Sequence, residues 1–181
     1  MTTALQIPSG TWTLDPAHTE VSFVARHAMV AKVRGTFRDV EGSIEAAEEL
    51  TDSRVRAQVQ TASVDTGNAD RDAHLRGADF FETDTYAQMS FTSTEISEVS
   101  EDGFVLTGDL TIKDVTRPVR FDVEFGGVAQ DPYGNQRAGF SARTQIDRED
   151  WGLTFNAALE TGGVLVSKKI TIEIEVSAVQ A

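Results

Sequence analysis

The sequence predicts an all-β fold: an antiparallel up-and-down β-barrel of about eight strands with one inserted α-helix. From Trp12 onward, apolar and polar residues alternate with a period of two in many short segments, and turn-forming residues separate these segments. The 181 residues contain no internal repeat and no Pro/Ser linker, so a single domain over residues 1–181 is expected. A β-sandwich is the alternative, and it would have a filled interior where the barrel would have a cavity.

The alternation is clearest in two segments. Val119, Phe121, Val123 and Phe125 are separated by charged residues, and residues 170–176 place Ile or Val at every second position. In the remaining segments the apolar residues also share one phase; in chain order these are residues 21–27, 55–59, 89–91, 104–112 and 138–146.

Short turns connect the segments, which favours sequential hairpins. The turn signals are Asp15-Pro16, the acidic stretch 48–53, Asp102-Gly103, residues 114–118 and residues 131–135. Near the end of one long strand, Gly126-Gly127 is typical of a bulge or sharp bend, and an ordinary loop start is the alternative.

One segment departs from the strand pattern. Asn68 is a good helix cap, apolar and long side chains follow at helical spacing through Arg76, and Gly77 is a stop signal. We therefore expect one helix after the third or fourth strand. A second, shorter helical turn is expected within residues 147–152.

The composition excludes several classes of function. Sixteen Lys and Arg stand against 29 Asp and Glu, and the formal net charge of -13 repels nucleic-acid backbones and anionic lipid surfaces at long range. The absence of cysteine rules out disulfides and thiolate sites. The amino terminus lacks the pattern of a signal peptide, and no apolar run of 18 residues occurs, so a cytoplasmic protein without stable membrane insertion is expected.

The sequence contains no recognisable catalytic or metal motif. His18, His27 and His74 lack the spacing of a metal site, and no nucleophile elbow, phosphate loop or dinucleotide fingerprint is present. We therefore expect no catalytic residue, no metal and no cofactor. The many neighbouring carboxylates are interpreted as a solvated acidic surface.

The inward phase of the strands predicts the side chains that contact a ligand. His27 continues the inward phase of residues 21–25 and is expected at a rim, where it would contact a ligand headgroup; a core histidine bonded to the backbone is the alternative. Trp151 and Phe155 are expected near one barrel end, with a packed plug as the alternative. The other predicted contacts are apolar strand residues, namely Phe23, Phe37, Phe91, Leu110, Phe121 and Phe140.

Several motifs occur together in one order. They are residues 14–23 (LDPAHTEVSF), Arg26-His27, residues 34–37 (RGTF), residues 63–68 (SVDTGN), residues 71–75 (RDAHL), residues 79–81 (DFF), residues 108–119 (GDLTIKDVTRPV) and residues 147–153 (DREDWGL). This set resembles the YceI-like family of polyisoprenoid-binding proteins, and the resemblance covers about residues 10–178.

The resemblance implies an extended, lipocalin-like barrel with a helix at its side and an apolar tunnel for a long isoprenoid chain. It implies the cytoplasmic type of the family, and it gives no catalytic residue to carry over. The expected function is non-enzymatic binding, transport or sequestration of an isoprenoid lipid, such as a polyprenyl phosphate or an isoprenoid quinone, by a monomer or a homodimer. The alternatives are an enzyme acting on such a lipid, through Asp147-Arg148, His27 or His74, and a filled barrel that recruits a protein partner.

Overall fold

The sheet closes on itself because β1 (Gly10–Leu14) pairs with two strands, β4 (Val40–Ala46) and β11 (Lys169–Gln180). A computed structural model describes residues 5–157, 159 and 165–181. The ring runs β1-β4-β5-β7-β8-β9-β10-β11, and every pair in it is antiparallel. The remaining members are β5 (Arg54–Gln60), β7 (Gln88–Ser97), β8 (Gly103–Ile112), β9 (Val115–Gln130) and β10 (Gln136–Asp147). The predicted eight-stranded up-and-down barrel is confirmed.

Three further strands lengthen the barrel at one end. β2 (Glu20–His27) continues the line of β1, β3 (Ala31–Phe37) leads into β4, and β6 (Val64–Asp65) follows β5. β11 accordingly pairs with β1 through residues 178–180 and with β2 through residues 171–175. In the gap between β1 and β2, the amide of Asp15 and the hydroxyl of Thr19 both donate to the carbonyl of Ser177.

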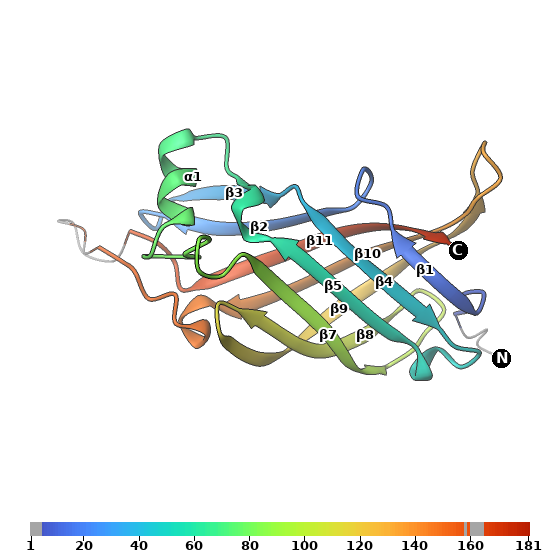
Figure 1. Cartoon of the computed structure of the whole chain (residues 1–181). Coiled ribbons are helices and arrows are strands. Elements are labelled where there is room, and N and C mark those ends of the chain that lie inside the picture. Colours follow the sequence, from blue (N-terminus) through green and yellow to red (C-terminus); the bar gives the residue numbers. More distant parts are fainter. Residues whose placement is uncertain (1–4, 158, 160–164) are drawn as a thin grey trace.

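The inserted helix α1 (Ala69–Arg76) follows β6 and lies at this lengthened end, opposite both termini (Figure 1). The expected place after the third or fourth strand is wrong, because residues 31–46 form two strands, β3 and β4, that were not among the predicted segments. The cap of α1 is the one expected from the sequence, since Asn68 Oδ1 accepts from the amide of Arg71. Arg76 fastens the helix to the barrel by donating to the carbonyls of Ala62 and Val64. The shorter helical turn is also confirmed, as a 3₁₀ helix over Arg148–Trp151.

A bulge bends the long β9–β10 hairpin. Phe140 pairs with Phe125 and Gly139 with Gly127, so Gly126 has no partner in the ladder. Gly127 has φ +108°, a conformation that favours glycine. The bulge interpretation of the two glycines is therefore confirmed.

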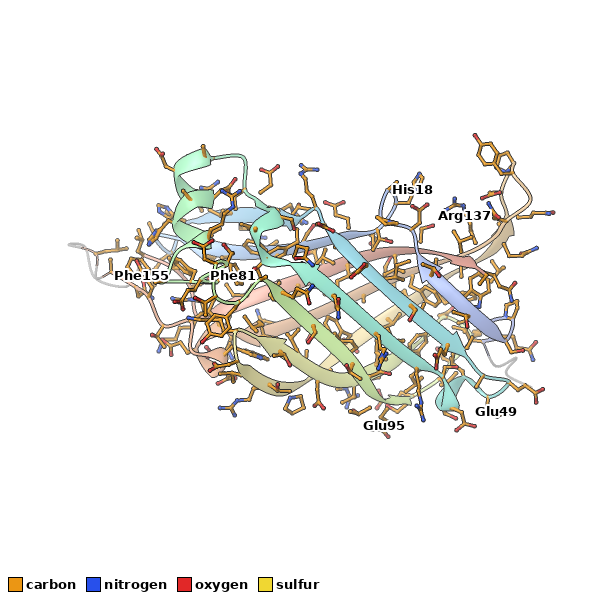
Figure 2. All side chains as sticks on the ribbon, in the orientation of Figure 1. His18, Glu49, Phe81, Glu95, Arg137 and Phe155 are labelled. Carbon is orange, nitrogen blue, oxygen red and sulfur yellow. The ribbon has the colours of Figure 1, made fainter. Side chains whose placement is uncertain are left out.

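An ion-pair network fixes the end that holds the termini, where Figure 2 labels Arg137. The Arg137 guanidinium lies 2.7 Å from Asp15 Oδ2 and 2.8 Å from Asp131 Oδ2. The hydrogen bond from Arg137 is the main reason that the pKa of Asp15 is lowered to about 2. The pKa of Asp131 is also lowered to about 2, mainly by the hydrogen bond from the amide of Asn135 and next by the hydrogen bond from the Arg137 side chain. The network joins the loop after β1 to the turn between β9 and β10.

Candidate functional site

An apolar cavity of about 260 Å³ occupies the barrel. Its wall includes residues from every strand of the ring, and nearly every lining side chain is aliphatic or aromatic. The lined part of β11 extends from Ile170 to Val176, about 20 Å of strand, so the cavity is long and narrow. This cavity contradicts the alternative of a filled barrel.

The structure brings six of the predicted site residues together on the cavity wall. Two of them, Phe91 and Phe121, pack edge to face with ring centroids 5.4 Å apart. All six come from inward positions of different strands, as the phase argument required; they are Phe23, Phe37, Phe91, Leu110, Phe121 and Phe140.

Glycines opposite aromatic rings make room for two of these side chains. Gly35 lies directly opposite Phe23 in the β2–β3 ladder, and a Cβ at Gly35 would overlap the Phe23 ring. A Cβ at Gly108 would likewise overlap Phe91. These glycines therefore allow each ring to lie flat along the wall, and they keep the cavity open.

A second cavity of about 420 Å³, lined by both apolar and polar residues, lies beside α1, and we refer to it as the vestibule. Its polar lining comes from β2, the loop before α1, and α1 itself. Phe23, Leu75 and Phe80 line both cavities, so the vestibule adjoins the apolar cavity at the α1 end. The polar vestibule residues are Arg26, His27, Thr66, Asp70, Arg71 and His74.

His27 lies on the vestibule wall and is exposed, and it does not line the apolar cavity. The expected rim position is therefore observed, and the alternative of a core histidine is wrong. Three vestibule residues, Arg26, Thr66 and Arg71, were not selected from the sequence. They lie on separate elements that are brought together only when the barrel closes. The run of residues 63–75, already part of the family resemblance, was the available signal.

Of the two residues expected near one barrel end, Phe155 lines a cavity and Trp151 does not. Phe155 lines the vestibule near α1 (Figure 2), and its ring centroid is 4.8 Å from that of His74 and 5.4 Å from that of Phe80. Trp151 is only 3% exposed and lines neither cavity, and its Nε1 donates to the carbonyl of Leu110 at 2.9 Å. The assignment of Trp151 as a ligand contact is thus corrected: it is a packed plug, because its 3₁₀ turn directs the ring into the wall.

Arg148 is a buried cation at the edge of the apolar cavity. It is 5% exposed, and its guanidinium donates to the carbonyls of Leu153, Val166 and Ser167. Burial lowers the pKa of Arg148, while the charges of nearby Glu149 and Asp147 act in the opposite direction. These bonds hold the chain after β10 against the barrel end.

The residues considered for acid–base chemistry have structural partners. Asp147 Oδ1 accepts from the amide of Glu149, and His74 Nε2 lies 2.8 Å from Asp79 Oδ2. Within residues 5–157, 159 and 165–181, no group of three or more His, Asp or Glu side chains could hold a metal ion. In the same part of the chain, no helix has the length and apolarity needed to span a bilayer.

Comparison with known proteins gives a consistent result. A model of the YceI-like domain matches residues 12–178. A UPF0312 protein of Staphylococcus epidermidis is 41% identical over 161 residues, which cover 88% of this chain and 91% of that protein. A UPF0312 protein of Staphylococcus aureus is 38% identical over 164 residues, covering 90% and 93%.

Two solved structures have the same fold. The Campylobacter jejuni YceI protein superposes with a TM-score of 0.74 at 30% identity, over 86% of this chain and 90% of that chain. A polyisoprenoid binding domain from Saccharophagus degradans superposes with a TM-score of 0.71 at 17% identity, over 94% and 98%. The second similarity concerns the fold alone.

Proposed function

The chain belongs to the YceI-like family, and from this premise we propose that it binds an isoprenoid lipid, with the tail in the apolar cavity and the head in the vestibule. The observation that carries the proposal is the junction of a narrow, almost wholly apolar cavity with a mouth where six polar side chains gather among apolar ones. An amphiphile with one long tail and one polar end has this same division. The fold similarity to a polyisoprenoid binding domain is consistent with it.

The apolar cavity supplies the affinity. Removing several hundred Å² of tail surface from water contributes on the order of 10 kcal/mol at about 25 cal/mol per Å². Association costs at least about 4 kcal/mol of this in lost motional freedom. Chain length is selected weakly, because one methylene-sized change in an apolar pocket alters binding by about 1–3 kcal/mol.

The vestibule selects the head. Arg26 and Arg71 contribute two positive charges there against the single carboxylate of Asp70, and His27 and Thr66 add further polar groups. Guanidinium groups bind phosphate oxygens in a bidentate manner. An anionic head such as that of a polyprenyl phosphate is therefore favoured over the neutral ring of a quinone. We propose that the protein carries or stores this lipid without altering it chemically.

Lipid extraction tests the proposal. The purified protein is extracted with organic solvent, and bound lipids are identified by mass spectrometry before and after long incubation. The expected result is an unchanged long-chain isoprenoid at substantial occupancy. Recovery of no lipid, or of a lipid converted to another compound, would contradict the proposal.

A pair of adjacent variants tests the location. Ala142 lines the cavity, whereas the neighbouring Ser141 faces outward and donates to Glu175. Ala142→Phe places a ring in the narrow cavity and is expected to lower lipid occupancy at least tenfold. Ser141→Phe adds the same ring outside and is the matched control. Equal occupancy in both variants would mean that the lipid is not in the barrel.

A further inference from the structure

The tip of the β2–β3 hairpin, residues 28–30, is exposed and apolar, and it adjoins the vestibule. Met29 is 59% exposed and Val30 is 82% exposed. Among the described residues the remaining large exposed apolar side chain is Tyr133, in the β9–β10 turn at the opposite end of the barrel (Figure 1). The hairpin and α1 share one end, and His27, which precedes the tip, lines the vestibule.

The residues at the tip are not the ones that its backbone conformation favours. The amide of Val30 donates to the carbonyl of His27, while Ala28 has φ +51° and Met29 has φ +64°. Positive φ at both central positions is the φ pattern of a type I′ turn, for which Asn-Gly is the favoured pair. Ala and Met are unfavourable in this conformation, and an apolar Met is unfavourable in water. Two local preferences are thus violated at one exposed position, which is typical of a functional surface.

The hairpin is basic in an acidic protein. Residues 21–37 contain no Asp or Glu, although the whole chain carries a net charge of -13. Arg26 and Lys32 are directly opposite each other in the ladder, an unfavourable arrangement for like charges unless an anion lies between them. Arg34 is 3.1 Å from Glu173, whereas no described carboxylate forms an ion pair with Arg26 or Lys32.

We propose that residues 28–30 dock on a bilayer that contains anionic phospholipid. Met29 and Val30 enter the interface, and Arg26 and Lys32 contact lipid phosphates, so that the vestibule faces the bilayer. The distant acidic surface opposes this contact little, because charges separated by more than about 8 Å are screened at physiological salt. The purpose of docking, passage of a lipid between bilayer and barrel, rests on the proposed function.

Vesicle flotation of the full chain tests the docking. The vesicles contain three parts phosphatidylcholine and one part phosphatidylglycerol, with pure phosphatidylcholine as the neutral comparison. Replacing both cations, Arg26→Gln with Lys32→Gln, is expected to weaken binding about thirtyfold, equivalent to about 2 kcal/mol at about 1 kcal/mol per cation. Tyr133→Asn, at the opposite end, is the control and leaves binding unchanged.

A tip variant separates membrane contact from folding. Ala28→Asn with Met29→Gly supplies the favoured type I′ pair and removes the larger exposed apolar chain. Its Tm is expected to stay equal or to rise, while vesicle binding falls at least tenfold. The proposal is overturned if the tip and charge variants float like the parent protein, or if the parent does not prefer the anionic vesicles.

The flotation result does not depend on whether the barrel binds a lipid. Loading of polyprenyl phosphate from detergent micelles is measured for the parent, the tip variant and Tyr133→Asn, and it is expected to be equal in all three, while transfer from vesicles slows in the tip variant. Absence of loading in every protein, the parent included, would refute the proposed function alone, and flotation would still decide the docking.

Discussion

Gly35→Ala is expected to displace the Phe23 ring into the junction between the two cavities. An alanine Cβ at this position would lie 2.5 Å from Phe23 Cε1 and 2.9 Å from Cε2, and closer still to Cζ. No backbone atom is among these nearest contacts, and Gly35 does not have positive φ. The ring of Phe23 is thus the obstacle, and it lines both the apolar cavity and the vestibule.

The expected loss of stability follows from two opposing effects. Overpacking a well-filled site costs about 1–3 kcal/mol. Replacing glycine by alanine at a compatible backbone position returns about 0.4–1 kcal/mol, because the unfolded chain loses freedom. The net loss is about 1–2 kcal/mol, which corresponds to a fall in Tm of roughly 2–8 °C for a chain of this size. Lipid occupancy is expected to fall as well.

A double-mutant cycle measured by thermal unfolding checks the reasoning. Phe23→Leu removes Cε1, Cε2 and Cζ, the three atoms that the new methyl group would meet. In that background Gly35→Ala is expected to be neutral or to stabilise the protein by about 0.4–1 kcal/mol. If the two substitutions are additive, the Phe23 ring does not occupy the space above Gly35, and the packing argument for the open cavity fails.

Four other predictions follow from the same structure. Asp15 and Asp131 each have a pKa of about 2 when folded, below the usual value of about 3.9. Their contribution to the stability of the folded protein is therefore complete above about pH 4 and is lost as pH falls toward 2. Arg137→Met should flatten the plot of Tm against pH across this range, and an unchanged plot would contradict the network. Arg148→Met leaves the carbonyls of Leu153 and Ser167 without their donor, while the carbonyl of Val166 still accepts from Asn156 Nδ2, and it should cost at least about 2 kcal/mol in urea unfolding. A near-neutral result would mean that solvent replaces the guanidinium. His27→Leu should keep Tm and tail binding and change headgroup preference a few-fold to tenfold, for a hydrogen bond of about 0.5–1.5 kcal/mol; a large fall in Tm with unchanged preference would make His27 a structural residue. A gel shift with duplex DNA at micromolar protein should show no retarded band, and a band that weakens with salt would contradict the electrostatic argument.

The strands and the helix could be predicted from short stretches of sequence. Alternation with a period of two specifies which face of each strand is buried, so five lining residues, among them Phe121 and Phe140, lie at inward positions of the predicted segments, whereas Phe37 lies outside those segments. The helix limits were also local, because Asn68 satisfies a free amide at the start and Gly77 follows the last turn. Neither inference required knowledge of the neighbouring strands.

Residues 31–46 were not among the predicted alternating segments, although they form β3 and β4. Their inward positions include Gly35 and Gly42, which carry no side chain to count. The missing volume is supplied across the sheet, by the Phe23 ring at Gly35 and by Leu14 at Gly42. Apolar periodicity within one strand cannot detect volume contributed by another strand.

The barrel lining was determined by the sequence, and the vestibule only by the tertiary structure. Arg26 and Arg71 lie on the vestibule wall with Phe155, although 84 positions separate the last two in the chain. Residues outside strands have no two-residue phase, which is why Trp151 was assigned to the site when it packs into the wall. Phase fixes the inner and outer sides of a strand, but closure of the barrel and docking of α1 decide which distant polar groups share its mouth.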